Sequence, residues 1–501
     1  MKGSEPSLPS AIYSAAQVRE LDRIAIEEHG VESYVLMSRA GEAALRTVQA
    51  RWPSAQKVLV YCGAGNNAGD GYVLARFAAA AGFAVRVLAL VPVQRLTGDA
   101  ARAARDCAAA GVRIDPFDAA AEPTRDFTPD VIADALLGTG IDRPLHDDFA
   151  KAVALVNAGS TPVLALDVPS GLHADTGLPL GDAIRASVTV TFIGLKQGCF
   201  LGMARDYCGE LELADLGVPA AWSAQLRPVF NRLMPADLKA ALPRRARTAH
   251  KGAHGRLLLV GGGPGMSGAI RLAAEAALRA GAGLVEVGTH PHSVATVMSG
   301  RPEIMCHPLE AADELDSLLE SADGVVVGPG LGRSAWSRAL WQRVSAANLP
   351  LVVDADALNL LAESPTPRGR WILTPHPGEA ARLLGTATAE IQRDRLAAVR
   401  TLAERYSGVA VLKGACTLVA AADLVHVCDR GNPGMAVGGM GDVLAGVLGA
   451  LVVQTNDLLR SARAGVLLHA LAGDSAAERG ERGMLAADLL PQIRRWANPS
   501  S

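Results

Sequence analysis

The sequence predicts an α/β fold in which each half of the chain forms its own three-layer α/β/α domain, and two observations carry this prediction. The chain has 501 residues, of which 50% are hydrophobic and 20% charged, so it exceeds the size of one ordinary hydrophobic core. In both halves, short β-branched or Leu-rich runs alternate with Ala-rich segments of helical length. This alternation is typical of parallel sheets wrapped by helices.

The first half opens with a helix over residues 16–28, because Val18, Leu21, Ile24 and Ala25 recur at helical spacing and Gly30 follows as a C-cap. Five strands are expected after it, at residues 58–62, 84–91, 131–137, 162–168 and 188–193. Ala-rich helical segments separate these strands. The order predicts a parallel, Rossmann-like sheet.

The pattern breaks over residues 228–254, where Pro235, Pro243 and the basic residues Arg244, Arg245 and Arg247 interrupt any strand signal. We therefore expect one domain over residues 1–227 and another over residues 228–501. A new series of strands is expected in the second domain at residues 256–260, 284–287, 324–327, 351–354, 371–374 and 409–413.

Composition restricts the class of function. Lys and Arg number 48 against 51 Asp and Glu, so no basic field favours nucleic acid or anionic lipid. The longest uninterrupted run of apolar residues and glycine, over residues 443–453, is much shorter than the roughly 20 residues that span a bilayer, and no secretory signal opens the chain. The seven cysteines include no Cys-x-x-Cys pair, which favours reduced thiols. We expect a cytoplasmic protein that acts on small molecules, as a monomer or a homo-oligomer.

A glycine-rich segment follows the first expected strand, with the sequence Gly63-Ala64-Gly65-Asn66-Asn67-Ala68-Gly69-Asp70-Gly71. We expect a loop here and a helix beginning near Tyr72, since backbone N–H groups in such a loop can approach a ligand phosphate. A tight strand-to-helix turn is the alternative. Four glycines, two asparagines and an aspartate exceed what a turn needs, which favours a binding site.

Polar residues also follow two other strands of the first half. Asp134 precedes a Gly138-Thr139-Gly140-Ile141-Asp142-Arg143 string, and the next strand leads into Asp167-Val168-Pro169-Ser170-Gly171. Because ligands of open α/β sheets bind outside the carboxyl ends of the strands, we expect the three segments to converge on one crevice. A capping or turn role is nearly as well supported for Asp134, whereas a functional role is favoured for Asp167.

In this order, the three strings resemble the NAD(P)HX epimerase domain over roughly residues 12–225. The resemblance implies that Asp167 is the catalytic acid/base and touches the substrate, and that potassium is coordinated by Asn67, Asp134 and Ser170. Lys196 is a second acid/base candidate, with a solvated lysine as the alternative. The remaining implied contacts to the hydrated nucleotide are Asn66, Asn67, Ala68, Gly69, Asp70, Gly138, Thr139, Gly140, Ile141, Asp142, Arg143 and Pro144. Ala68 stands where the family usually has Gly, and we expect the site to tolerate it.

The second half carries a pattern of dinucleotide-binding proteins. Gly263-Pro264-Gly265-Met266-Ser267-Gly268 follows an expected strand and precedes a helix over residues 269–280, and Glu286 comes about twenty residues later. Taken alone this is a weak signal. It leaves an NAD-dependent oxidoreductase open as an alternative.

A stronger signal lies at Gly431-Asn432-Pro433-Gly434-Met435-Ala436-Val437-Gly438-Gly439-Met440-Gly441-Asp442, before an apolar helix. Glycine-rich backbone at a helix N-terminus makes an anion hole, and Asp442 can abstract a proton from a substrate hydroxyl during phosphoryl transfer. A glycine-rich turn with an N-cap Asp is the alternative. No Gly-Lys dipeptide occurs, which excludes a Walker A loop.

With the strings around Gly328–Gly332, Asp354–Asn359, Thr374–Glu379 and Lys413–Thr417, this segment resembles the ribokinase-like, ADP/ATP-dependent NAD(P)HX dehydratase domain over about residues 229–498. The resemblance implies hydrate contacts at Ala269, Gly330 or Gly332, His376 and Asp442. It implies nucleotide contacts at Lys413, Gly414, Ala415, Cys416, Thr417 and Gly441. Without the surrounding motif, His376 would be interpreted as a structural histidine in a turn. Magnesium bridging the diphosphate is expected, with Glu379 as one candidate ligand, and Met440 replaces the Thr often found in related kinases.

The two resemblances together imply a bifunctional enzyme that repairs NADHX and NADPHX. The first domain would equilibrate the C6 epimers, and the second would dehydrate the S form after its hydroxyl is phosphorylated by ADP, with Asp442 as base. Three alternatives stay open: a vitamin or sugar kinase with a regulatory domain, a non-catalytic nucleotide sensor, and the oxidoreductase. The choice between ADP and ATP, and between the two hydrates, is also open.

Overall fold

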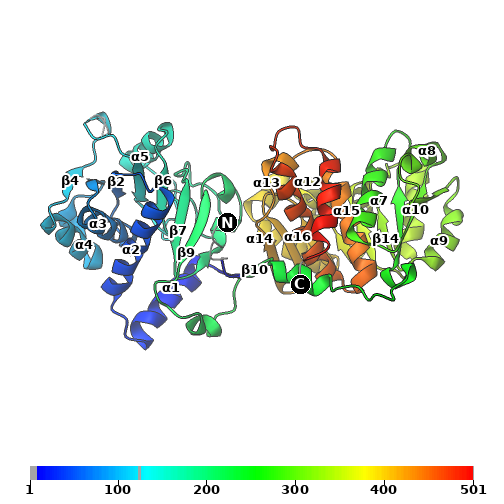
Figure 1. The fold of residues 1–501 in the computed structure, drawn as a ribbon, viewed down its shortest axis with the longest axis horizontal. Coiled ribbons are helices and arrows are strands. Elements are labelled where there is room, and N and C mark those ends of the chain that lie inside the picture. Colours follow the sequence, from blue (N-terminus) through cyan, green and yellow to red (C-terminus); the bar gives the residue numbers. More distant parts are fainter. Residues whose placement is uncertain (1–7, 122–125, 500–501) are drawn as a thin grey trace. The chain divides into compact units, whose positions relative to one another are not determined.

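The computed structural model describes residues 8–121 and 126–499 and divides into two compact units, Met1–Phe230 and Asn231–Ser501. Figure 1 shows the first, here called the N-terminal unit, in blue to green and the second, the C-terminal unit, in green to red. Each unit is a sheet with helices on both faces. The predicted fold class is confirmed.

The sheet of the N-terminal unit has seven parallel strands in the order β4-β3-β2-β5-β6-β7-β9. The five expected strands are present as β2 (Lys57–Cys62), β3 (Ala84–Ala89), β5 (Val131–Ala135), β6 (Val163–Leu166) and β7 (Val188–Phe192). Two edge strands, β4 (Arg113–Pro116) and β9 (Glu210–Ala214), were not predicted. A separate parallel pair joins β1 (Ala11–Tyr13) and β8 (Leu195–Lys196).

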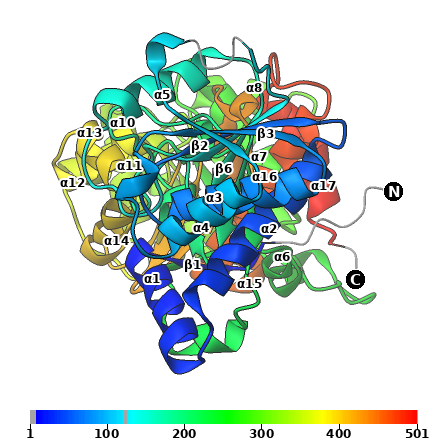
Figure 2. The same ribbon diagram turned by 90° about the vertical axis from the view of Figure 1, so that its left-hand side faces the viewer.

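Alternation along the strands divides the core of this unit between two faces. Val58 and Val60 of β2 pack with helices α2 (Ser33–Arg51), α3 (Asn66–Ala80) and α4 (Gly98–Ala109), whereas Leu59 and Tyr61 pack with α5 (Asp147–Ala158). Figure 2 shows α5 on one side of the sheet and the other three helices on the opposite side. The first helix, α1 (Ala15–Arg23), ends in a π-helical turn over Ile24–Glu28 rather than continuing as one helix.

Helix α3 begins at Asn66, so the prediction of a loop up to Gly71 was wrong. The glycines allow close packing of the helix. A methyl group on Gly69 would lie 2.4 Å from the Cε of Met37, and one on Gly71 would lie 2.4 Å from the Cβ of Ala135. These glycines therefore bring α3 against α2 and β5, and only residues 63–65 form the strand-to-helix loop.

The sheet of the C-terminal unit has the strand order β13-β12-β11-β14-β15-β16-β17-β18-β19-β10. The six expected strands are β11 (Arg256–Gly261), β12 (Leu284–Thr289), β14 (Gly324–Val327), β15 (Leu351–Val353), β16 (Trp371–Leu373) and β17 (Val409–Leu412), all parallel. The antiparallel hairpin strands β18 (Thr417–Ala421) and β19 (Leu424–Cys428) and the edge strand β13 (Met305–Pro308) were not predicted.

The segment in which no strand was expected contains the short strand β10 (Phe230–Arg232), which pairs with β19, and the helix α6 (Pro235–Ala241). Pro235 occupies the first turn of α6, where a missing N–H costs nothing. The proline that argued against a strand therefore starts a helix.

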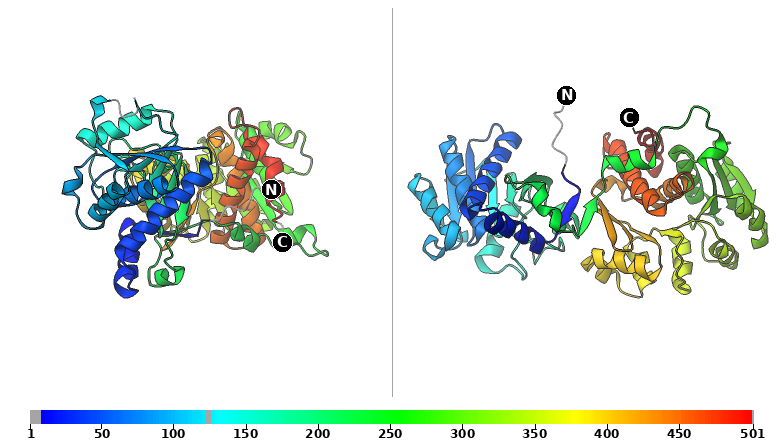
Figure 3. Two further views of the ribbon diagram at one scale, coloured as in Figure 1. Left: turned by 60° about the vertical axis from the view of Figure 1, so that its left-hand side comes forward. Right: turned by 90° about the horizontal axis from the view of Figure 1, so that it is seen from below.

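One face of the sheet in the C-terminal unit packs against α7 (Ser267–Ala280), α15 (Met440–Thr455), α16 (Leu458–Ala477) and α17 (Leu489–Trp496). Figure 3 shows the orange helices of this group and the yellow helices on opposite sides of the sheet. The other helices of the unit are α8 (Val294–Met298), α9 (Asp316–Ser321), α10 (Ala335–Ala346), α11 (Ala355–Glu363), α12 (Pro377–Leu384), α13 (Thr388–Arg393) and α14 (Arg395–Arg405). Among the described residues, no helix combines the length and apolarity needed to cross a bilayer. All seven cysteines are free.

Candidate active sites

The carboxyl ends of β2, β5 and β6 bring predicted residues of the N-terminal unit together. A methyl group on Gly138 would lie 3.3 Å from the Cβ of Asn67 and 3.9 Å from the Oδ2 of Asp167. Gly138 therefore separates the start of α3 from the residue that follows β6. This edge of the sheet is where an open α/β fold binds its ligands.

Asn67, Asp134 and Ser170 form a buried cluster of oxygens. The Ser170 hydroxyl donates to Asp134 Oδ1 at 2.6 Å, and the Ser170 N–H donates to Asp134 Oδ2 at 2.8 Å. Asn67 donates through Nδ2 to the Leu137 carbonyl at 2.9 Å, while its buried Oδ1 has no hydrogen-bond partner. Asp134 also accepts the Leu136 N–H at 3.2 Å, so it stabilises the turn after β5, as the alternative interpretation of this residue expected. An unpartnered amide oxygen beside a carboxylate and a hydroxyl fits a cation that prefers oxygen ligands.

Asp167 follows β6 in a left-handed conformation, with φ of +70°, which is uncommon for a residue with a side chain. Its Oδ1 makes an ion pair with Lys196, whose side chain is only 1% exposed. Lys196 also donates to Thr191 Oγ1 at 3.0 Å and to the Phe192 carbonyl at 2.8 Å. The alternative of a solvated Lys196 is therefore wrong.

Two more carboxylates act on this ion pair. Burial raises the pKa of Asp22 to about 6, with Lys196 opposing and Asp167 adding to the shift. Burial, followed by Asp167 and Asp22, raises the pKa of Asp70 well above its ordinary value. Asp22 lies on α1 next to the apolar positions of that helix. No sequence motif marks Asp22, so motif analysis could not identify it.

The rest of the predicted epimerase contacts differ in their surroundings. Ala68 is fully buried inside α3, where an Ala in place of Gly is ordinary helix geometry. Gly140 and Asp142–Pro144 are exposed, and within the described residues Asp142 and Arg143 make no hydrogen bond or ion pair.

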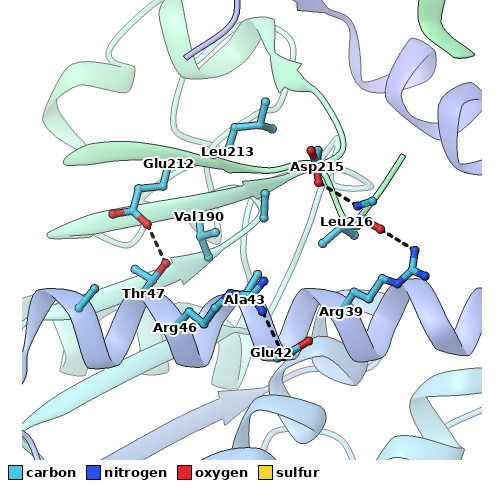
Figure 4. A pocket seen from close by; sticks show the side chains of 13 residues that line it. Arg39, Glu42, Ala43, Arg46, Thr47, Val190, Glu212, Leu213, Asp215 and Leu216 are labelled. Atoms are coloured by element: carbon cyan, nitrogen blue, oxygen red, sulfur yellow. Dashed lines mark hydrogen bonds and ion pairs between the residues drawn. The ribbon is translucent and has the colours of Figure 1, made fainter. Parts of the chain in front are cut away.

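A different pocket of the N-terminal unit, of about 610 Å³, lies between α2 and the edge strand β9. Figure 4 shows Arg39, Glu42 and Arg46 from α2 on one side and Glu212 and Asp215 on the other. Glu212 accepts a hydrogen bond from Thr47 at 2.7 Å. None of the predicted site residues lines this pocket.

In the C-terminal unit, Asp354 and Lys413 form the centre of the second site. Asp354 follows β15 and is 2% exposed; its Oδ1 accepts from Lys413 Nζ at 2.7 Å and from the Thr374 hydroxyl at 2.7 Å. Glu379 Oε2 lies 3.8 Å from the same ammonium. Burial acts to lower the pKa of Lys413, but Asp354, Glu379 and Asp442 outweigh it, and the pKa is raised. Lys413 is thus held as a cation.

Asp442 lies in the first turn of α15, and Gly439 in the left-handed conformation is the N-cap residue. The alternative of an N-cap Asp therefore does not describe Asp442. Burial and then the negative charge of Asp354 raise the pKa of Asp442 to about 7, against the opposing effect of Lys413. A methyl group on the preceding Gly441 would lie 3.4 Å from Lys413 Nζ. A carboxylate that titrates near neutrality can serve as a general base.

The backbone around Lys413 is shaped by Arg395, which no sequence motif identifies. The buried guanidinium of Arg395 donates to the carbonyl oxygens of Leu412, Lys413 and Cys416 at 3.1–3.3 Å. A methyl group on Gly414 would lie 2.6 Å from the same guanidinium. The turn from β17 to β18 therefore wraps a buried cation.

His376 has the structural role that a lone histidine would favour. It caps α12, where its Nδ1 accepts the N–H groups of Gly378 at 3.0 Å and Glu379 at 3.4 Å, while the Glu379 carboxylate accepts the His376 N–H at 2.8 Å. The imidazole is 51% exposed at this edge of the sheet. Its Nε2 lies 3.5 Å from Glu379 Oε1.

The loops after β11 and β14 are hydrogen-bonded to each other. Gly263 donates to the Gly330 carbonyl at 2.7 Å, and a methyl group on Gly330 would lie 3.2 Å from the Cβ of Ala269. Gly332 donates to Asp356 Oδ2 at 2.8 Å. Glu286, expected for an oxidoreductase, is instead buried within β12 and lies 3.2 Å from the guanidinium of Arg256. The ribose-binding acid of that alternative is therefore not at the strand end.

The expected magnesium ion has no ready-made group of acidic, histidine or cysteine ligands in the described part of the chain. Across residues 8–121 and 126–499, no group of three His, Cys, Asp or Glu side chains is arranged to hold a metal ion. Glu379 uses one carboxylate oxygen to cap α12. A magnesium ion that keeps waters and binds mainly through phosphates fits such a surface better than one held by a dedicated cage.

Comparisons with known proteins show the family of each half of the chain. One family model, described as YjeF-related protein N-terminus, matches residues 33–198, and another, described as NAD(P)H-hydrate dehydratase, matches residues 257–495. The bifunctional NAD(P)H-hydrate repair enzymes Nnr of Coxiella burnetii and Escherichia coli are 49% and 45% identical, over 98% and 100% of this chain and 100% and 96% of their own lengths. A ribokinase-like superfamily protein from Enterococcus faecalis is 27% identical, with a TM-score of 0.51 over 53% of this chain and 95% of that chain.

The two folds and their carboxylate–lysine sites define an enzyme with an epimerase-type domain and a ribokinase-like domain. The chain belongs to the family of bifunctional NAD(P)H-hydrate repair enzymes. The resemblance noted from the sequence is confirmed.

Proposed function

We propose that the chain interconverts the R and S epimers of hydrated NADH and NADPH in its N-terminal unit and dehydrates the S epimer in its C-terminal unit with ADP. One observation carries the proposal furthest: each unit pairs a lysine with a carboxylate at the carboxyl edge of its sheet, the buried Lys196 with Asp167 and the buried Asp354 with the partly exposed Lys413. The family membership supplies the substrate class.

In the epimerase unit, inversion at C6 needs a proton to be given to the hydroxyl or ring nitrogen and taken back. Asp167 is the proposed acid/base, and Lys196 holds it in place and supplies a fixed positive charge. Asp70 and Asp22 have raised pKa values, so their protonated, uncharged forms are favoured beside this ion pair. Asn67, Asp134 and Ser170 are the proposed potassium ligands, and bound potassium would offset the charge of the substrate diphosphate.

In the dehydratase unit, Asp442 is proposed to take the proton of the C6 hydroxyl as its oxygen attacks the β-phosphorus of ADP and AMP departs. The phosphate then leaves C6 with its bonding electrons, pushed by the ring nitrogen, and loss of a C5 proton restores the dihydropyridine. Lys413 and the Gly439–Gly441 backbone at the start of α15 can stabilise phosphoryl charge. Magnesium bound to the nucleotide would neutralise the remaining charge.

The experiment that tests this function follows absorbance of the reduced nicotinamide after purified protein is added to mixed R and S hydrates with potassium, magnesium and ADP or ATP. Complete recovery is expected with the native chain. Asp167→Asn, which keeps an acceptor for Lys196, should stop at the S fraction, and Asp442→Asn should give no recovery. A stable phosphorylated product without reduced nicotinamide would instead indicate a kinase.

A further inference from the structure

The C-terminal unit has a group of rings that the proposed chemistry does not use. His290 follows β12 directly, His292 lies close behind it, and Trp336 lies in the first turn of α10. The ring centroids of His290 and His292 are 4.9 Å apart at 68°, and those of His290 and Trp336 are 5.4 Å apart at 74°. These three side chains are called the ring cluster below.

The ring cluster lies at the same edge of the sheet as Asp354 and Gly330. Thr289, the last residue of β12, donates through its hydroxyl to the Gly262 carbonyl after β11 at 2.8 Å. Trp336 Nε1 donates to the Leu309 carbonyl, directly after β13, at 2.8 Å. The rings therefore stand where the loops that follow β11 to β14 meet.

Hydrogen bonds fix two of the rings while leaving surface open. The indole is held through its bond to Leu309, and His290 Nδ1 accepts the His292 N–H at 3.3 Å. His290 and Trp336 are half-buried, and His292 is exposed. Oriented, partly open aromatic surfaces are the kind of platform on which a planar base stacks.

The position of the ring cluster suits the remote half of a dinucleotide. ADP is proposed at Lys413–Thr417, after β17, and the reacting C6 lies near Asp442 and Asp354, after β15. On the other side of β15 the sheet continues through β14 and β11 to β12, three strand spacings or about 14 Å. Because ADP occupies the β17 side of the site, the adenylate half of the hydrate must extend in the other direction, past Gly330 toward the ring cluster.

We propose that the ring cluster binds the adenine base of the hydrated dinucleotide, at the end remote from the reacting C6. This inference rests on the proposed dehydratase activity. Stacking of one base on an aromatic side chain is worth roughly 5- to 150-fold in affinity. The loss of Trp336 should therefore be seen in binding of the whole substrate and not in the chemistry at C6.

The test compares Trp336→Ala and His290→Ala with the native enzyme on two substrates, the S hydrate of NADH and the corresponding hydrate of reduced nicotinamide mononucleotide, which lacks the adenylate half. The native enzyme should have the lower KM for the intact hydrate. Each variant should raise that KM, about 10-fold or more for Trp336→Ala, and leave the KM values for the truncated hydrate and for ADP unchanged. Equal changes with both hydrates, or none, would overturn the assignment.

Two controls separate stacking from folding and from phosphate binding. Trp496→Ala removes another half-buried indole whose N–H is bonded, here to Ser475 at 3.0 Å, and should not alter the KM for either hydrate.

Trp336→Phe keeps an aromatic face and should retain most of the affinity; a loss equal to that of Trp336→Ala would argue against stacking. Trp336→Ala should raise the KM values for the hydrates of NADH and NADPH by the same factor. An increase limited to the NADPH hydrate would indicate that Trp336 contacts the 2′-phosphate and would overturn the adenine assignment. Native activity on the intact hydrate tests the proposed function separately.

Discussion

At the scale of single residues, both proposed sites pair a lysine with a carboxylate. Lys196 is 1% exposed beside Asp167, and Lys413 is 2.7 Å from Asp354, which is 2% exposed. Asp354, Glu379 and Asp442 together raise the pKa of Lys413. We therefore assign the lysines the role of orienting the carboxylates and assign proton transfer to the carboxylates near them.

The dehydration rate should depend on the ionisation of Asp442. Burial and Asp354 raise its pKa to about 7, and only the deprotonated form can accept a proton. The rate at saturating substrate should therefore rise from about pH 6 to pH 8 and then level off. Removing the repulsion in Asp354→Asn should move the inflection to lower pH. Asp356→Asn should move the inflection less, because Asp356 makes a smaller contribution to the raised pKa of Asp442 than Asp354 does. An inflection that does not move in Asp354→Asn would contradict this account.

Replacing Lys196 should affect only epimerisation. Lys196→Met removes the ammonium that orients Asp167, and we expect the rate of R-to-S conversion to fall by at least about 100-fold. Dehydration of pure S hydrate should be unchanged. Lys151→Met is the matched control, because Lys151 is 60% exposed and forms an ion pair with the nearby Asp148. Native-like epimerisation by Lys196→Met would refute the role given to the pair.

Potassium should stabilise the N-terminal unit if Asn67 Oδ1 is one of its ligands. That oxygen is buried without a partner, and a cation that binds only the folded form raises its stability. The unfolding midpoint should be higher in potassium chloride than in choline chloride at equal ionic strength. Asn67→Ala should remove most of the difference, and a potassium effect that survives in Asn67→Ala would place the ion elsewhere.

At the scale of elements, close packing decides where α3 begins. Positions 69 and 71 lie within the helix and are glycine because a side chain at Gly69 would collide with Met37 and one at Gly71 with Ala135. The same glycines looked like loop residues in the sequence, since glycine serves both flexible turns and tight helix packing. Which of the two applies depends on neighbours that are distant in the chain.

Alanine substitutions at two helical glycines should therefore have opposite effects. Gly71→Ala meets Ala135 at 2.4 Å and Cys62 at 3.0 Å; overpacking of about 1–3 kcal/mol exceeds the gain of about 1 kcal/mol in helix propensity. The unfolding midpoint of the N-terminal unit should fall by a few degrees. At Gly268 in α7, an added methyl group would have no neighbouring atom within 4 Å. Gly268→Ala should therefore raise the unfolding midpoint of the C-terminal unit. Calorimetry can follow both, and a stabilising Gly71→Ala would contradict the packing argument.

The central elements could be predicted because burial on both faces leaves a clear pattern. The strands β2, β5, β14 and β17 are buried throughout or nearly so, and they are mostly apolar in the sequence, with Lys57 at the start of β2 and Asp134 within β5 as the exceptions. The edge strands β4 and β9 are half-exposed, with charged residues at several positions, and so resemble loops. Motifs marked Asp167 and Asp442, but Asp22 and Arg395 reach their sites only through tertiary packing.

At the scale of the whole molecule, each proposed site is built within one unit. The substrate is then free to leave one site and reach the other through solvent. A mixture of Asp167→Asn and Asp442→Asn should therefore convert mixed hydrates completely, although neither variant does so alone. The rate of conversion by the mixture should depend on the concentration of each variant. If the mixture stops at the S fraction, transfer between sites of one chain is required.

The burial of the cysteines gives the molecule a chemical property of its own. Burial raises the pKa of Cys306 to about 11 and those of Cys107 and Cys428 to about 12, and it holds the pKa of the fully buried Cys62 well above its ordinary value. Oxidants and alkylating agents attack the thiolate, which these four side chains scarcely form at neutral pH. At these positions the protein resists the oxidative conditions that inactivate enzymes with exposed, acidic thiols.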